Sequence, residues 1–168
     1  MLNRVMRIHK VSFLASVMAF LFTACNSAEM SYIDEVADIP LKWAGYPSTA
    51  WAEAPLRANA AYLLYGAESA KERQRRVGDY YYVRWYDAEP EKPAKLVMRY
   101  TQALTASEEQ RQEQEIEAPR DGRGIRLHRF EFNGPERAKR GDVLSWRVEL
   151  YVDGQLRDAH KSYLWQDK

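Results

Sequence analysis

The sequence predicts an all-β fold, an antiparallel two-sheet β-sandwich of about seven strands. Several short segments after residue 57 alternate apolar with polar side chains, as strands with one buried face do. Clusters of turn-forming residues separate these segments, at "DAEPEKP", "PRDGRG", "NGPERAKRGD" and "DG". The sequence has no repeated strand, helix, strand pattern, which argues against a parallel sheet. A small β-barrel is the alternative architecture.

Residues 142–165 carry the clearest signal, which is that of a β-hairpin. Alternate positions hold Leu144, Trp146, Val148, Leu150 and Val152. Asp153-Gly154 then forms a two-residue turn, because this pair accepts the positive φ angles of a type I′ turn. In the returning strand Leu156 and Leu164 fall on one face but Tyr163 on the other, so we expect a β-bulge.

Three further strands are predicted at residues 79–87, 94–104 and 124–132. In the first, Tyr81, Val83 and Trp85 share one face, and Tyr80, Tyr82, Arg84 and Tyr86 share the other. Residues 107–118 have a helix-forming composition. We nevertheless predict a charged edge strand there, because strands flank the segment and a hairpin connection follows it.

Two regions are harder to interpret. Residues 58–66 and 69–78 fit either a strand followed by a charged helical turn or two halves of an interrupted edge strand. Residues 25–56 contain turn formers and no sustained period, so we predict a tether ahead of a domain that spans residues 57–168. The aromatic residues Trp43, Tyr46 and Trp51 suggest that part of this tether packs along the domain.

Residues 1–24 have the organisation of a signal peptide. A positive head with Arg4, Arg7 and Lys10 precedes the apolar run "VSFLASVMAFLF". This run is shorter than the roughly 17–25 apolar residues that a transmembrane helix needs. We therefore expect export with cleavage, and an uncleaved membrane anchor is the alternative.

Phe22-Thr23-Ala24-Cys25 ends the apolar run, and Cys25 is the only cysteine of the chain. These four residues resemble the lipobox of bacterial lipoproteins, in which Leu is usual where Phe22 stands. The resemblance implies cleavage before Cys25, acylation of its thiol and anchoring in a membrane. Asn26 stands where an aspartate would favour the inner membrane, which implies sorting to the outer membrane. The alternative is an incidental thiol near the end of an ordinary signal peptide.

The predicted domain also resembles immunoglobulin and fibronectin-III domains, at the level of the fold and over roughly residues 57–166. Short antiparallel strands with regularly spaced turns carry this resemblance. The Cys, Trp, Cys pattern of true immunoglobulin domains is absent from the sequence. The resemblance implies a two-sheet scaffold and no particular activity.

Charge and motifs argue against several classes of function. Three of the 25 basic residues lie within residues 1–24, so 22 basic and 24 acidic residues remain after cleavage, which argues against nucleic-acid binding. The common metal, phosphate-loop and nucleophile motifs are absent from the sequence. His128 and His160, the latter near Asp158, make a metal or acid–base site only if the fold brings them together. We expect no enzyme activity, no metal and no cofactor.

The polar face of residues 79–87 is the candidate binding surface. An aromatic and cationic strip would consist of Tyr80, Tyr82, Arg84 and Tyr86, beside Tyr100 and Tyr151 of other strands. Strips of this kind suit protein contacts or stacking on sugars. Alternatively, the N-terminal segment with Trp43 and Trp51 covers these aromatic side chains.

These observations favour a cell-envelope lipoprotein, anchored in the outer membrane through Cys25 and facing the periplasm or the cell surface. Its β-sandwich would be a non-catalytic binding or scaffolding domain, with an envelope protein or a glycan as partner. A carbohydrate-binding module of the cell surface and a small envelope hydrolase are the alternatives.

Overall fold

The computed structural model describes residues 29–42, 54–105 and 108–166. The predicted signal peptide, Cys25, Trp43, Tyr46 and Trp51 lie outside the described residues. None of the described helices is long and apolar enough to cross a membrane. In chain order the elements are β1 (Tyr32–Asp38), α2 (Ala54–Leu64), α3 (Ala70–Arg75), β2 (Gly78–Asp87), β3 (Ala94–Gln102), β4 (Gln110–Ile116), β5 (Gly124–Asn133), α4 (Gly134–Arg140), β6 (Val143–Val152) and β7 (Gln155–Lys161).

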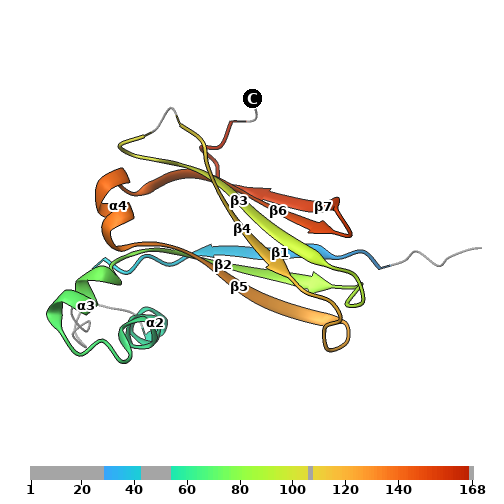
Figure 1. Cartoon of the computed structure of the whole chain (residues 1–168), viewed down its shortest axis with the longest axis horizontal. Coiled ribbons are helices and arrows are strands. Elements are labelled where there is room, and N and C mark those ends of the chain that lie inside the picture. The colour runs from blue at the N-terminus through green and yellow to red at the C-terminus, as the bar shows by residue number, and fades with distance from the viewer. Residues whose placement is uncertain (1–28, 43–53, 106–107, 167–168) are drawn as a thin grey trace, which may run out of the picture.

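The described strands form two antiparallel sheets that pack face to face (Figure 1). One sheet has three strands in the order β1-β2-β5, and the other has four in the order β4-β3-β6-β7. The predicted all-β two-sheet sandwich with seven strands is therefore confirmed. β4 pairs with β3, whereas the fourth strand of a constant-type immunoglobulin domain belongs to the opposite sheet.

The core between the sheets consists largely of the side chains that the alternation predicted, joined by Ile33 of β1. Leu144, which the alternation placed on the same face as Val148, is exposed instead, because the register of β6 against β3 shifts at this residue. Val83 and Trp85 of β2 are fully buried, and so are Leu96 and Met98 of β3. They pack in one cluster with Val148 and its neighbours on β6. The burial of these large apolar side chains supplies the main driving force for folding.

Hydrogen bonds join the two sheets at both edges of the sandwich. Where β1 lies along β7, the backbone N–H of Ile33 donates to Asp158 Oδ2 over 2.8 Å. On the opposite edge, Gln114 Nε2 of β4 donates to the carbonyl oxygen of Arg129 on β5 over 2.7 Å. Each bond satisfies a backbone group of an edge strand that has no further strand beside it.

The predicted hairpin is formed by β6 and β7. Asp153 and Gly154 have φ angles of 53° and 71°, as a type I′ turn requires. Leu150 pairs with Asp158 whereas Tyr151 pairs with Leu156, so one extra residue is inserted into β7 and the expected bulge is confirmed. The charged edge strand predicted within residues 107–118 is confirmed as β4.

The prediction that residues 25–56 form a tether is wrong for part of that segment. β1 pairs with β2 along its whole length, and Leu41 makes a further bridge to Gly78. The domain therefore begins well before residue 57. β1 escaped prediction because Ile33 is its only deeply buried side chain, and the rest of the strand has the polar character of a solvated edge.

Residues 58–66 fall mostly in a helix, which neither of the two alternatives predicted. α2 buries Ala60, Leu63 and Leu64, the i, i+3 and i+4 positions of one helical face. The charged helical turn predicted for residues 69–78 is confirmed as α3, whose capping box joins Ser69 and Glu72. The predicted turn at residues 133–142 contains the short helix α4.

The two ends of the sandwich differ, because one carries loops and the other carries the described helices (Figure 1). At the loop end, where β1 starts, lie the connections 88–93, 117–123 and 153–154. At the helix end, where β1 finishes, lie α2, α3 and α4. The loop end is on the right of the figure and the helix end on the left.

A buried ion pair holds the loop end together. Asp87 is fully buried, and Arg120 binds both of its carboxylate oxygens, with Nε–Oδ2 at 2.6 Å and Nη2–Oδ1 at 3.0 Å. Arg120 also donates to the carbonyl oxygens of Glu89, Lys92 and Glu117. Burial raises the pKa of Asp87, but the hydrogen bonds and charge of Arg120 outweigh it and hold this pKa below its ordinary value.

We expect Arg120→Ala to lower the free energy of unfolding by about 3–5 kcal/mol, because it leaves a buried carboxylate without its main partner. Arg126 remains beside the carboxylate, with its Nε 3.4 Å from Asp87 Oδ2, so the loss of unfolding free energy should lie near the lower value. Urea denaturation measures this change. Lys95→Ala is the control, since it removes partly exposed pairs with Glu113 and Glu115 and a contact with the ring of Tyr151, and it should cost less than about 1 kcal/mol. Equal losses in the two variants would contradict the importance of the buried pair.

Candidate functional site

α2 covers half of the outer face of the three-stranded sheet. The cluster beneath it consists of Leu41, Ala60, Leu63, Leu64 and Tyr80. Tyr82 packs at the margin of this cluster. Arg84 and Tyr86 lie further along the same face of β2, where none of the described helices packs, and Arg84 is exposed. The strip that the sequence predicted is thus divided into two halves. Tyr80 and Tyr82 form the covered half, and Arg84 and Tyr86 form the open half.

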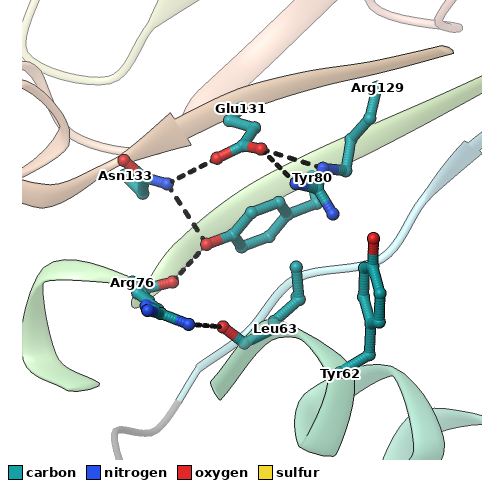
Figure 2. Close-up of a pocket in the computed structure, with 7 residues that line it drawn as sticks. All are labelled: Tyr62, Leu63, Arg76, Tyr80, Arg129, Glu131 and Asn133. Atoms are coloured by element: carbon teal, nitrogen blue, oxygen red, sulfur yellow. Dashed lines mark hydrogen bonds and ion pairs between the residues drawn. The ribbon is translucent and has the colours of Figure 1, made fainter. Parts of the chain in front are cut away.

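Tyr80 belongs to the covered half and is not a surface residue. Only 1% of it is exposed. Its hydroxyl donates to the carbonyl oxygen of Arg76 over 2.5 Å and accepts from Asn133 Nδ2 over 3.2 Å (Figure 2). Burial, which is the largest effect, raises the pKa of Tyr80. The prediction that Tyr80 presents its ring to a partner is therefore wrong, because the ring supports α2 instead.

A groove runs between α2 and β5 beside the covered half; we call it the α2 groove. It is a hollow of about 540 Å³ lined by Ala58, Asn59, Tyr62, Tyr82, Leu127, His128, Arg129 and Glu131. A smaller hollow of about 310 Å³, drawn in Figure 2, shares Tyr62, Arg129 and Glu131 with it. Because three residues line both hollows, they form one continuous depression.

Arg129 is the centre of the α2 groove. Its guanidinium carbon lies 5.7 Å from the ring centroids of Tyr62 and Tyr80, and 5.9 Å from that of Tyr82. Arg129 Nε donates to Glu131 Oε1 over 2.9 Å, which fixes the cation among the three rings. The groove therefore presents an oriented cation, a carboxylate and aromatic faces within one small area.

Two large apolar side chains of the groove are exposed to a ligand. Tyr62 is 68% exposed and Leu127 is 63% exposed. Tyr82 is held at the floor, since its hydroxyl donates to Asn59 Oδ1 over 2.7 Å. This combination of a fixed polar floor and free apolar walls suits the binding of a ligand by stacking and hydrogen bonding.

The open half of the strip is polar, and two carboxylates face its single cation. Arg84 Nε lies 2.5 Å from Asp34 Oδ2, and its Nη2 lies 3.2 Å from Glu35 Oε2. Tyr86 stacks on Tyr32 with ring centroids 5.5 Å apart. Two neighbouring carboxylates offset the charge of Arg84, so the open half lacks the unopposed cation that the strip prediction assumed.

Tyr100 and Tyr151 do not extend the strip, because both lie in the other sheet. Tyr100 is buried in the core, in edge-to-face contact with Phe132 at a centroid distance of 4.4 Å. The expectation that these two tyrosines lie beside Tyr82 and Tyr86 is therefore wrong.

The two histidines are not brought together. His128 is on β5, where it packs beside Trp85 at a centroid distance of 6.2 Å, and burial lowers its pKa. His160 is on β7, with Nε2 3.9 Å from Asp158 Oδ2. β5 and β7 lie at opposite edges of the sandwich, because β7 adjoins β1 and β1 is the far strand of the sheet of β5. Within the described residues, no three His, Cys, Asp or Glu side chains are placed to hold a metal ion.

Of the residues that line the α2 groove, only Tyr82 and His128 were singled out from the sequence; the six that were missed are Ala58, Asn59, Tyr62, Leu127, Arg129 and Glu131. The helical spacing of Ala60, Leu63 and Leu64 would have placed Asn59 and Tyr62 on the flanks of a helix. No local signal joins these residues to Arg129 and Glu131, which lie on a strand far along the chain.

Comparison with protein-family models found no match, and comparisons with curated proteins and with solved structures also found none.

Substitution should separate the structural from the available residues of the strip. We expect Tyr80→Ala to lower the free energy of unfolding by about 3–5 kcal/mol, as for other buried aromatic side chains. Arg84→Ala should change it by less than about 1 kcal/mol, because its ion pairs are exposed. Thermal or urea unfolding of both variants measures the difference. A Tyr80→Ala protein as stable as the wild type would show that α2 does not rest on this ring.

Proposed function

We propose that this chain is a lipid-anchored protein of the bacterial cell envelope whose β-sandwich is a non-catalytic protein-binding domain. Cys25 is the proposed site of acylation, and the outer membrane is the proposed location. The lipobox-like sequence Phe22-Thr23-Ala24-Cys25 supports the anchor. The α2 groove, with its exposed aromatic wall around an oriented cation, is the observation that carries the binding role.

The composition of the α2 groove favours a protein partner. Tyr and Arg are enriched among the residues that contribute most to protein–protein binding. Tyr62 and Leu127 offer exposed apolar area, and Asn59 and Glu131 offer polar atoms at the rim. A partner segment that inserts an apolar side chain beside Tyr62 and pairs with the polar rim matches this surface.

A glycan is the second candidate ligand, since the exposed ring of Tyr62 lies in the same groove as Asn59, Arg129 and Glu131. A hydrolase fits the groove less well. Glycoside hydrolysis generally needs a pair of carboxyl groups on either side of the bond that breaks. Glu131 is the one carboxylate among the described lining residues, and Arg129 holds it in an ion pair.

Intact-mass spectrometry of the membrane-extracted protein tests the anchor. We expect a mass equal to residues 25–168 plus acyl groups, because the proposed cleavage lies before Cys25 and the thiol is acylated. The Cys25→Ser variant should lack the acyl groups and fail to sediment with membranes. A native protein that keeps residues 1–24, or that begins near Cys25 without acyl groups, would contradict the proposed anchor.

Site-specific photocrosslinking in intact cells tests the binding role. A photoreactive amino acid in place of Tyr62 should yield one discrete crosslinked protein, and the same probe in place of the exposed Leu144 should not. Arg129→Ala should weaken the Tyr62 crosslink, whereas Arg84→Ala, which removes a cation outside the groove, should leave it unchanged. Identical crosslinking from both positions would contradict a partner in the groove, and competition by added glycans would favour the second candidate.

A further inference from the structure

The described chain is attached to the sandwich from its first residues, close to the proposed anchor. The carboxylate of Glu29 accepts a hydrogen bond from Tyr86 Oη over 3.0 Å. Ser31 is buried, and its Oγ accepts from the backbone N–H of Ala88 over 3.0 Å. β1 begins at the next residue, Tyr32. The three residues 26–28 are therefore all that separate Cys25 from a residue held on the domain.

The length of this connection limits how far the domain can stand from the membrane. A fully extended chain advances at most about 3.6 Å per residue, so the Cα atoms of Cys25 and Glu29 are at most about 14 Å apart. The headgroup region of one leaflet is about 5–8 Å thick, from the difference between the whole bilayer and its hydrocarbon core. An acylated Cys25 would lie at the border of the hydrocarbon core. Glu29 would then lie within or just above the headgroups.

We propose that the loop end of the sandwich rests directly on the headgroup surface of the membrane that holds the acyl chains. This inference rests on the proposed acylation of Cys25. The partner of this surface is the lipid bilayer itself. The helix end and the α2 groove then point away from the membrane, since α2 lies at the opposite end of the sheet from the start of β1 (Figure 1). Tyr86 lies six residue steps beyond Tyr80 along β2, a rise of about 20 Å.

The side chains at the loop end suit an interfacial position. Met30, Tyr32 and Ile125 are exposed there, and Ile125 is 54% exposed although it lies in a sheet. Tyr32 stacks on Tyr86, its partner on β2, and Tyr86 pairs in turn with Ile125 on β5. These three residues form one row across the three-stranded sheet. Tyrosine is enriched at the interface between membrane and water, where the ring and the hydroxyl are both accommodated.

The charges at the loop end do not form a basic patch. Its exposed acidic residues are Glu29, Glu91, Glu117, Asp121 and Asp153, and its more accessible basic residues are Lys92 and Arg123. A surface of this kind gains little from anionic lipids, which attract clusters of Lys and Arg. The contact therefore depends on the short connection to Cys25 and on the apolar side chains, and it should form on zwitterionic lipid.

Single-cysteine labelling of the full acylated chain tests the inference, because acylation of Cys25 removes the only other thiol. Ile125→Cys and Leu144→Cys place an environment-sensitive fluorophore at the loop end and at the start of β6, near the helix end. Both positions are exposed, so both variants should keep the wild-type circular dichroism spectrum and melting temperature. The proteins are reconstituted into phosphatidylcholine vesicles that contain nitroxide-labelled lipid.

We expect the label at position 125 to be quenched by the nitroxide lipid at least twofold, and the label at position 144 to be unaffected. Absence of quenching at position 125 on an acylated protein would overturn the inference while leaving the proposed function intact. A fluorophore at position 125 that is shielded from water in native envelope membranes but not in pure lipid vesicles would overturn the inference as well, in favour of a protein partner. Two labels per molecule, with an intact mass that lacks acyl groups, would overturn the proposed anchor and this inference together.

Discussion

The buried carboxylate of Asp87 organises the loop end of the sandwich. Asp87 ends β2, and Arg120 reaches it from the connection between β4 and β5 while also binding three backbone carbonyl groups of the two connections. The residue after Asp87 is Ala88, whose N–H binds Ser31 and so fixes the chain just ahead of β1. A buried charge is tolerated only when its partner and hydrogen bonds are complete, so the shapes of both connections and the entry of the N-terminal chain depend on this pair.

The outer face of the three-stranded sheet shows how a sandwich acquires distinct surfaces. α2 needs only three buried residues to cover Tyr80, and β2 continues beyond it as a polar face with Arg84 between two carboxylates. The α2 groove lies along the flank of α2, above β5. α2 thus contributes to both a stabilising cluster and a candidate binding surface. Both lie toward the end of the sheet that is remote from the start of β1.

Strict alternation made the sheet predictable from sequence, and its absence explains the errors. β2 alternates over its whole length and β6 does so from Trp146 to Val152, so these core side chains were predicted correctly, and Asp153-Gly154 specified the hairpin through local backbone preferences. Leu144 is the exception, because a shift of register against β3 leaves it exposed. β1 carries one deeply buried side chain and α2 carries three. In such short segments these are too few to reveal the period of two of a strand or the period of 3.6 of a helix. Of the candidate binding residues, Tyr82 does lie in the α2 groove, whereas Arg129 and Glu131 come from a distant strand, and only the tertiary fold brings them to α2.

The position of β1 is the claim on which the rest depends, because it brings the sandwich to within a few residues of Cys25. Amide hydrogen exchange of the full chain, followed residue by residue by NMR, tests it most directly. The bond from Ile33 N–H to Asp158 and the pairing of β1 with β2 predict slow exchange for Ile33 and for the β1 amides that face β2. Exchange at the rate of an unstructured peptide throughout residues 32–38 would contradict it, since the chain ahead of α2 would then be a long tether that lets the domain stand away from the membrane.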